Sequence, residues 1–140
     1  MDSYWESSKN TGIKMKSIFS ITWKRSKQPR KQRKYRYNAP LHTKRNFLSI
    51  HLSKELRTKY KKRSIPVRKG DTIKVLRGQF RKKTGKISKV DYNSIKVYIE
   101  GIEVIKKDGN KVQYPISPSN LMITTLKLDD KKRIALLERK

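Results

Sequence analysis

Lysine and arginine dominate the residues of this chain that could do chemistry, and the chemistry they offer is the neutralisation of phosphate. The 140 residues include 38 Lys+Arg against 11 Asp+Glu, so the formal net charge is +27. Residues 26–70 alone hold sixteen basic residues and one acidic residue, Glu55, which gives this segment a net charge of +15. Because nearby carboxylates cannot neutralise so many cations, the pattern predicts a polyanionic partner.

The densest part of this segment is residues 27–36, KQPRKQRKYR, with six cations in ten residues. It has almost nothing apolar to bury, so we expect it to be disordered alone and to order on its partner. A short isolated run of this kind would be explained by a solvated tail or a localisation signal. Here further basic residues follow, and Tyr35 and Tyr37 stand among the cations, as suits stacking on bases beside phosphate contacts. The charge pattern predicts nucleic-acid binding without separating RNA from DNA.

Catalytic and metal-binding chemistry have few candidate residues. The chain has no cysteine, which excludes disulfides, thiol nucleophiles and Cys-ligated metals. His42 and His51 are nine residues apart, a spacing that matches none of the usual metal-ligand patterns, so we interpret them as polar surface residues or RNA contacts. Paired acids and a phosphate-loop signature are missing at useful spacing. We therefore expect no catalytic residue, no metal, no cofactor and no small-molecule substrate.

The length suits one modest domain with tails. No apolar run approaches the roughly 18 residues that span a bilayer, and the apolar stretch at residues 18–23 is too short for a signal peptide. A membrane-surface protein would carry the charge but also a strongly amphipathic helix, which is missing here. We expect a cytoplasmic protein that does not bind membranes.

Two short helices are predicted after Pro40. Residues 41–50 have a loose helical pattern of apolar residues with one basic face. Ser53 can cap a second helix that runs to Tyr60, with Glu55 in the first turn, where the helix dipole favours an acid. Residues 63–71 form a boundary, because Pro66 disfavours helix at the preceding residue and Gly70-Asp71 is a turn pair.

From Asp71 onward the apolar period changes to two, which predicts five short, half-buried antiparallel strands. Val75 and Val97 are expected to face inward, whereas Lys74 and Lys96 face outward. Ile87 and Val90 break the alternation of the second strand, which indicates a bulge. Strands this short must hide their edges, and a small bent barrel does so. Asp129 or Asp130 can then cap a C-terminal helix. The five expected strands centre on residues 73–75, 87–90, 95–99, 112–116 and 121–123.

Residues 67–87, VRKGDTIKVLRGQFRKKTGKI, resemble the KOW motif, a strand-loop-strand unit of SH3-like barrels. The flanking sequences sharpen this resemblance. Together they resemble the large-subunit ribosomal KOW proteins called L-twenty-four in bacteria and L-twenty-six in eukaryotes, and the basic opening and short C-terminus look archaeal. These flanks are SKQPRKQRK at 26–34, APLH at 39–42, LSKELR at 52–57 and RSIPVRKGD at 63–71.

The resemblance implies a mostly β fold: a small SH3-like barrel with short N-terminal helices, a basic extended arm and a short C-terminal helix. It also implies a structural, non-catalytic protein that binds the 5′ domain of large-subunit rRNA, helps to initiate subunit assembly and lies near the polypeptide exit tunnel. Its expected partners are rRNA, neighbouring ribosomal proteins, and a nascent chain or targeting factors at the tunnel exit. The expected segments are 1–25 (atypical extension), 26–40 (basic RNA-binding arm), 41–66 (short helices), 67–126 (barrel) and 127–140 (C-terminal helix).

The predicted RNA contacts are cations and their neighbours on the arm, the helices and the barrel loop. The glycines among them are turn residues that would let the backbone approach RNA. One position departs from the family pattern, because Lys82 stands where a glycine is common and would resist a left-handed backbone. The set is Lys27, Arg30, Lys31, Arg33, Lys34, Tyr35, Arg36, His42, Lys44, Arg45, Arg57, Arg63, Arg68, Lys69, Arg77, Gly78, Arg81, Lys82, Lys83, Gly85 and Lys86.

Residues 1–25 match nothing in the family pattern and carry a net charge of only +3. A genuine extension and a misplaced start codon would both explain them. We expect them to contribute neither to RNA binding nor to the fold, although Trp5, Phe19 and Trp23 argue otherwise, because large aromatic residues usually pack on something. The alternative function in the same class is a KOW-type transcription elongation factor or another RNA-binding factor, which usually carries a second domain.

The +15 segment generates the first testable prediction. Deleting residues 26–40 should flatten the slope of log affinity for rRNA against log salt by several units, because each phosphate contact contributes about 0.7 to 0.9 to that slope. Filter binding of the full and shortened chains across a salt series measures it. An unchanged slope would contradict the prediction.

Overall fold

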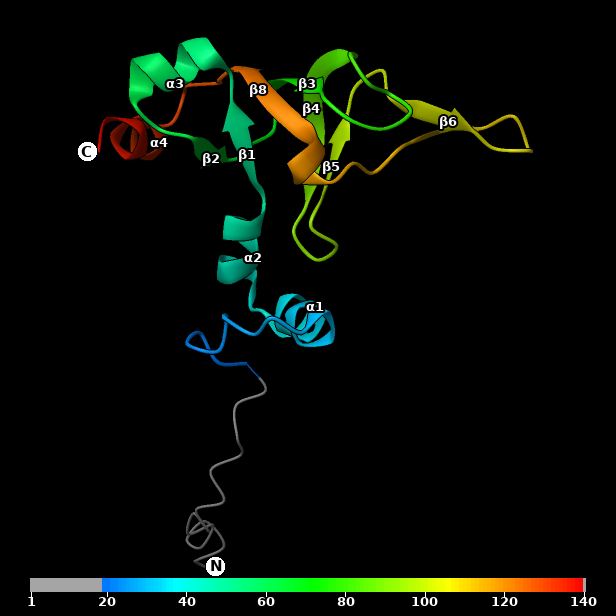
Figure 1. The fold of residues 1–140 in the computed structure, drawn as a ribbon. Coiled ribbons are helices and arrows are strands. Elements are labelled where there is room, and N and C mark those ends of the chain that lie inside the picture. Colours follow the sequence, from blue (N-terminus) through cyan, green and yellow to red (C-terminus); the bar gives the residue numbers. More distant parts are fainter. Residues whose placement is uncertain (1–18, 140) are drawn as a thin grey trace, which may run out of the picture. The chain divides into compact units, whose positions relative to one another are not determined.

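The computed structural model describes residues 19–139, which fall into two units, one ending at Ala39 and one beginning at Pro40 (Figure 1). The first unit contains helix α1 (Pro29–Asn38). The second contains all the strands and the other helices. Within the described residues no helix is long and apolar enough to cross a membrane.

The second unit is built on a six-stranded sheet in the order β2-β1-β8-β3-β4-β5. A separate two-stranded sheet pairs β6 with β7 and forms a hairpin. After the hairpin the chain returns to β5, where Ile116 and Val97 exchange two backbone hydrogen bonds of 2.9 Å, before it enters β8. The sheet curls into a small barrel-like fold, as expected. The strands are β1 (Ser49–Leu52), β2 (Ser64–Pro66), β3 (Thr72–Val75), β4 (Thr84–Asp91), β5 (Lys96–Ile99), β6 (Glu103–Ile105), β7 (Lys111–Gln113) and β8 (Leu121–Thr125).

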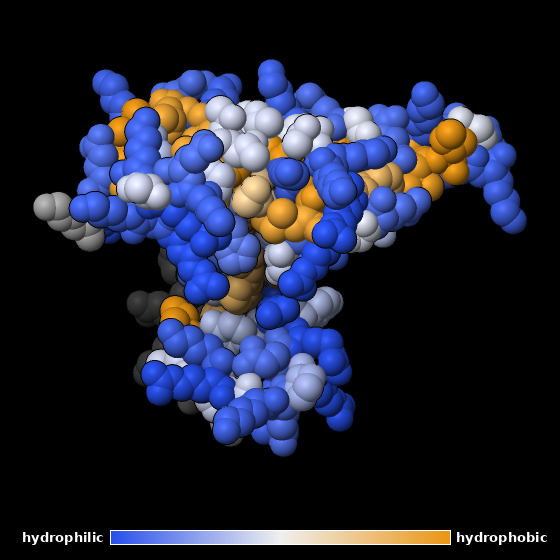
Figure 2. Space-filling view, turned by 45° about the horizontal axis from the view of Figure 1, so that its top comes forward, coloured by the Kyte–Doolittle hydropathy of each residue, from blue (hydrophilic) through white to orange (hydrophobic). Residues whose placement is uncertain are grey.

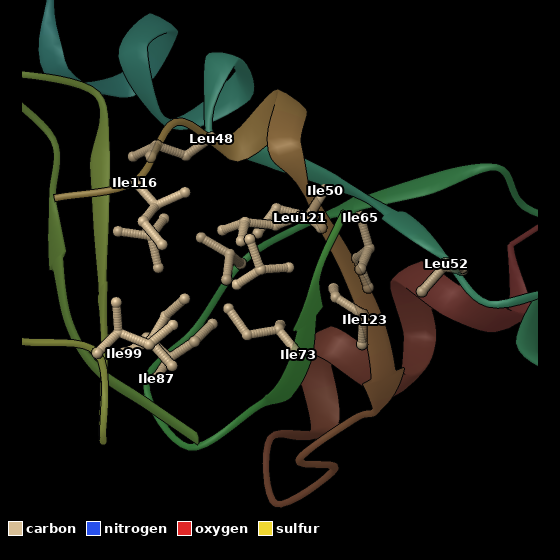
Figure 3. Packing of buried hydrophobic residues seen from close by; sticks show 14 of the residues in the cluster. Leu48, Ile50, Leu52, Ile65, Ile73, Ile87, Ile99, Ile116, Leu121 and Ile123 are labelled. Atoms are coloured by element: carbon tan, nitrogen blue, oxygen red, sulfur yellow. The ribbon is translucent and has the colours of Figure 1, made fainter. Parts of the chain in front are cut away.

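The core lies inside the curled sheet and is made almost wholly of branched aliphatic side chains. Ile73 from β3 and Ile123 from β8 lie side by side, and Ile87 and Ile99 face the same interior from β4 and β5 (Figure 3). Val75 and Val97 are buried, while Lys74 and Lys96 are only partly covered. The predicted strand register is therefore confirmed at these positions.

The strand pattern differs from the expectation in several respects, one of which is that strand β6 was not predicted. Two strands precede Asp71, β1 and β2, where the sequence pattern indicated a helix end and a boundary. β1 pairs with β8 in parallel, so the sheet is mixed rather than wholly antiparallel. Another difference is at residues 112–116, where Val112 and Tyr114 are exposed and only Ile116 is buried, because β7 ends at Gln113 and pairs with β6 in a separate sheet, whereas Ile116 pairs with Val97 of β5.

The predicted helices before the barrel are confirmed with a shorter first helix. Helix α2 (Leu41–Phe47) stops before β1, and helix α3 (Lys54–Tyr60) has the predicted cap, in which the Leu56 N–H donates to Ser53 Oγ. Glu55 lies in the first turn of α3. A short 3-10 helix, η1 (Pro118–Asn120), leads into β8.

Strand β4 contains the predicted bulge, because its register with β5 shifts between Ile87 and Lys89. Asp91 organises the turn that follows by accepting hydrogen bonds from the N–H groups of Asn93 and Ser94. The hydrogen bond from the Ser94 side chain, followed by that from its backbone N–H, lowers the pKa of Asp91. Ile95 takes a φ of 55° there, a left-handed conformation that is unusual for a β-branched residue. It is therefore a turn residue and not, as expected, the first residue of the strand.

A buried ion pair attaches helix α4 (Lys131–Glu138) to the barrel. The Arg133 guanidinium donates two parallel hydrogen bonds of 2.7 Å to the two carboxylate oxygens of Asp71. The same carboxylate accepts from the backbone N–H groups of Arg68 and Lys127, each at 3.0 Å. Both charged side chains are almost fully buried, so Asp71 joins the entrance of β3, the exit of β8 and the C-terminal helix.

Asp130 fulfils the predicted role of cap for α4 by accepting the Lys132 N–H at 2.9 Å. That backbone hydrogen bond is the main cause that lowers the pKa of Asp130, and the Arg68 guanidinium, which pairs with it, also contributes. Leu137 is buried on the inner face of the helix, and Ile134 is half-buried beside it. The C-terminal helix is confirmed.

The expectation of an extended basic arm is wrong for most of its length, because residues 29–38 form α1. Pro29 occupies the first turn, where its fixed φ suits a helix, and the lysines, arginines and glutamine that follow are good helix formers. The helix stops before Ala39, since the residue that precedes a proline disfavours helical backbone.

Residues 19–25 pack on α1, so the expectation that the extension contributes nothing to the fold is also wrong here. The Gln32 side-chain amide donates to the carbonyls of Lys24 (2.9 Å) and Ser26 (2.7 Å). The rings of Phe19 and Tyr35 lie 4.8 Å apart between centroids. Trp5 and the rest of residues 1–18 lie outside the described part of the chain.

The buried ion pair generates a prediction about stability. Replacing Asp71 with Ala leaves Arg133 buried without its partner and should lower the free energy of unfolding by about 3–5 kcal/mol. Asp129→Ala is the matched control, because this exposed carboxylate pairs only with the exposed Lys127, and exposed pairs contribute at most about 1 kcal/mol. Urea denaturation of the two variants compares them. Equal losses would contradict the assignment of Asp71 as the internal anchor.

Candidate nucleic-acid interface

The loop between β3 and β4, residues 76–83, presents a group of exposed cations. Phe80 is its only buried residue and packs against Tyr114 with ring centroids 5.3 Å apart. Backbone hydrogen bonds from Lys82 N–H to Val75 and from Val75 N–H to Lys83, both 2.9 Å, close its base. This anchoring fixes the loop while the charged ends of Arg77, Arg81, Lys82 and Lys83 remain exposed to solvent.

Two residues of the loop have left-handed backbone, Gly78 with φ 95° and Lys82 with φ 72°. Gly78 adopts this conformation without steric cost, and the space around it is open. Lys82, which was expected to resist a left-handed backbone, adopts it at a cost of roughly 1–2 kcal/mol. The lysine adds a cation to the loop at the expense of backbone strain.

A glycine is needed at position 85 for a different structural reason. It lies inside β4 rather than in the turn, so its interpretation as a turn glycine is wrong. A Cβ there would meet the Glu100 carbonyl oxygen at 2.6 Å and an Ile99 methyl at 2.7 Å. The missing side chain lets β4 and β5 approach closely, and an RNA contact by Gly85 stays a prediction. Lys86, the next residue, is exposed on the same strand.

A second group of cations lines a groove between α2 and the bulged part of β4, with a volume of about 890 Å³. We call it the basic groove. His42, Arg45 and Lys69 are exposed along it, and Arg68 is half-buried because it pairs with Asp130. The predicted residues His42, Arg45, Arg68 and Lys69 are thus brought together, although they come from two separate stretches of sequence. The full lining is Leu41, His42, Arg45, Val67, Arg68, Lys69, Ser88, Lys89, Val90 and Tyr92.

Other predicted contacts are more scattered within the second unit. Arg57 uses its Nε to donate to the Leu52 carbonyl at 2.9 Å, so part of its guanidinium is already occupied. Arg63 is exposed immediately before β2, and Lys44 is half-buried on α2. These three residues line neither the loop nor the groove, and their contact with RNA stays a prediction.

Helix α1 carries the predicted cations of the first unit. Arg30, Lys31, Arg33, Lys34 and Arg36 are all exposed. Lys27 lies just before the helix and is exposed as well. Tyr35 is half-buried against Phe19, whereas Tyr37 is 82% exposed. Residues 19–39 contain eight basic and no acidic side chains, a net charge of +8.

Internal ion pairs neutralise few of these charges. Three are present among residues 19–139, and they involve Asp71, Asp129 and Asp130. Every cation of the β3–β4 loop is outside them. Blue, hydrophilic side chains accordingly cover most of the face seen in Figure 2. Within the described residues, no cluster of three or more His, Asp or Glu could hold a metal ion.

Sequence reasoning missed Lys89 and Tyr92 in the basic groove. Lys89 is exposed at the bulge, and Tyr92 is 40% exposed in the turn that follows. The only signal in the sequence was the broken alternation at Val90, which predicted the bulge but not which side chains it would turn toward α2. The contacts of Phe19 and Trp23 with α1 had no signal beyond the aromatic residues themselves.

Comparison with known proteins gives one family match. The family of ribosomal proteins described as L26 in eukaryotes and L24 in archaea matches residues 26–140. The large ribosomal subunit protein uL24 of Methanosphaera stadtmanae is similar to this chain, with 49% identity over 115 residues that make up 82% of the chain and 98% of that protein. The match begins where the dense basic segment begins.

The backbone of the β3–β4 loop generates a prediction. Lys82→Ile should lower the melting temperature by several degrees, because a β-branched residue disfavours the left-handed conformation, and about 1 kcal/mol shifts the midpoint of a small domain by about 4–8 °C. Lys82→Gly should not lower it, since glycine relieves the strain.

Lys83→Ile is the matched control, because Lys83 is an exposed neighbour without positive φ. Calorimetry of the three variants measures the difference. If Lys82→Ile and Lys83→Ile melt at the same temperature, the left-handed backbone at Lys82 is incorrect.

Proposed function

Because the chain belongs to the family of the eukaryotic L26 and archaeal L24 ribosomal proteins, we propose that it is a structural constituent of the large ribosomal subunit and binds its rRNA. The observation that carries the proposal is the family match over residues 26–140, which includes every predicted RNA contact. The cations on the surface of the β3–β4 loop, the basic groove and α1 support it. They supply the charge that an RNA partner requires.

The mechanism is the neutralisation of phosphates where RNA helices converge. Arg77, Arg81 and the neighbouring lysines dock on a helix backbone from a loop whose base is fixed by β3 and β4. Double-stranded RNA is recognised mainly through its shape and its phosphates, so a rigid group of cations suits it better than base-reading side chains. The α1 cations act on a second stretch of backbone and release counterions there.

The position within the subunit follows from the family resemblance. We place the chain on the 5′ domain of the rRNA, early in assembly, near the polypeptide exit tunnel and beside other ribosomal proteins. The β6–β7 hairpin supports a role at the tunnel exit, because Val104, Ile105 and Val112 are exposed on it and Val104 pairs with Val112 across its two strands. Hydrophobic side chains are visible at the right of Figure 2. A nascent chain or a targeting factor could use such a surface.

Catalysis is not part of this function. The family is one of ribosomal proteins rather than enzymes, and we propose that the chain has no enzymatic activity, cofactor or small-molecule substrate. It works in the cytoplasm on ribosomes. Nothing in the comparisons favours the alternative of a transcription elongation factor.

Co-sedimentation tests the proposal. The protein should remain with the large subunit in a density gradient after a high-salt wash of native ribosomes. Arg77→Glu combined with Arg81→Glu should be lost in the wash, because two phosphate contacts account for about 1.4 to 1.8 units of the salt slope and the reversed charges repel RNA.

The matched control is Lys131→Glu with Lys132→Glu, which makes the same change in net charge on the exposed first turn of α4. This variant should stay bound. Release of the unmodified protein by the wash, or equal loss of the two double variants, would contradict the proposed function.

A further inference from the structure

The first unit contains a pocket that lies partly outside the region matched by the ribosomal family. Phe19, Ser20 and Trp23 form one side, and the matched region, which starts at residue 26, contributes the rest from α1. We call this the aromatic pocket. Its remaining lining residues are Lys31, Lys34, Tyr35 and Asn38.

Specific hydrogen bonds fix the chain segment that forms one side of the pocket. The Gln32 amide fixes residues 24–26 against α1 through its two hydrogen bonds to backbone carbonyls. Within the preceding segment, the backbone N–H of Trp23 donates to the Ser20 carbonyl at 3.3 Å, and the Ser20 and Thr22 hydroxyls are 2.9 Å apart. The aromatic side chains therefore project from a fixed turn.

Aromatic faces and cations alternate around the pocket. The Lys31 ammonium lies 5.2 Å from the centroid of the Trp23 ring, within the range of a cation–π contact. Phe19 packs on Tyr35 from the other part of the wall. Trp23 nevertheless remains 64% exposed, so much of the indole is open to a further partner. A large exposed aromatic side chain next to lysines has the chemistry of the platforms on which proteins stack bases.

The size of the pocket suits one flat ring. Its volume is about 190 Å³, and a cavity of about 150 Å³ holds a benzene molecule. With eight basic and no acidic side chains in residues 19–39, the surroundings favour a ligand that carries negative charge. An RNA nucleotide combines a flat aromatic base with a negatively charged phosphate, and bases outside a duplex are those that proteins stack on aromatic side chains.

We propose that the aromatic pocket binds one unpaired base of RNA, which stacks on Trp23 while its phosphates lie on Lys31 and Lys34. This inference rests on the proposed function, since it names a recognition element for the same RNA partner. It goes further in assigning residues 19–25, which lie outside the family match, a direct role in RNA binding. It also adds a preference for an unpaired base to a protein that otherwise binds phosphates.

Three RNA hairpins that differ at one position test the proposal on the full-length protein. The first is a perfect duplex, the second carries a single-adenosine bulge and the third carries an abasic residue in the bulge. The full chain should bind the adenosine bulge about tenfold more tightly than the abasic bulge, the size expected of one base–aromatic stack. In a Trp5→Phe background, binding of the adenosine bulge should quench Trp23 fluorescence, while the abasic bulge should quench it less.

Variants assign the preference to the pocket. Trp23→Ala should bind the two bulged hairpins equally, and Trp23→Phe, which retains a smaller ring, should keep part of the preference. Ile21→Ala is the matched control, because Ile21 is also 64% exposed in the same segment but does not line the pocket. It should behave like the unmodified chain. Circular dichroism monitors the helicity of each variant.

The outcomes separate this inference from the proposed function. If the unmodified chain binds all three hairpins with equal affinity, the pocket does not recognise a base. This is the result expected if the pocket binds a protein side chain instead. The same conclusion holds if Trp23→Ala keeps the full preference. If the chain binds none of the hairpins at low salt, RNA binding itself is wrong, and the proposed function fails with it.

Discussion

The buried carboxylate of Asp71 is the interaction on which the second unit depends most. It lies just before β3 and accepts hydrogen bonds from the neighbouring Arg68 and from Lys127 and Arg133, which lie more than fifty residues further along the chain. A buried carboxylate is tolerated only when it is fully paired. Because Asp71 needs all these donors, the barrel entrance, the exit of β8 and helix α4 must come together at one point.

A strongly basic chain can fold and still keep its cations for a partner when its few acidic residues each stabilise one defined part of the fold, as Asp71 does. The acids that have defined structural roles lie at turns and caps: Asp91 orders the β4–β5 turn, and Asp130 begins α4. The core cluster is almost wholly aliphatic and contains no charged side chain. The loop from Arg77 to Lys83 is therefore held by backbone hydrogen bonds and by Phe80, not by ion pairs, and its cations remain available.

Features that depend on local sequence could be predicted, whereas those that depend on distant partners could not. The inward positions of Val75 and Val97, the bulge after Ile87 and the Ser53 cap follow from alternation and capping rules. The parallel pairing of β1 with β8 needs a partner some seventy residues away, and Arg133 reads as one more surface cation until it meets Asp71. The cations of the interface were evident from the composition. The positions of Tyr92 in the basic groove and of Trp23 beside Lys31, and the backbone strain at Lys82, depend on the three-dimensional path of the chain and could not be predicted.

The most direct measurement of the central claim, that the loop and the N-terminal cations contact large-subunit rRNA, is ultraviolet cross-linking of native large subunits followed by mass spectrometry of the peptide–nucleotide adducts. Adducts should map to residues 27–36 and 77–86, on nucleotides of the 5′ domain. Adducts confined to α4 and the β6–β7 hairpin, or found only on small-subunit rRNA, would contradict the claim.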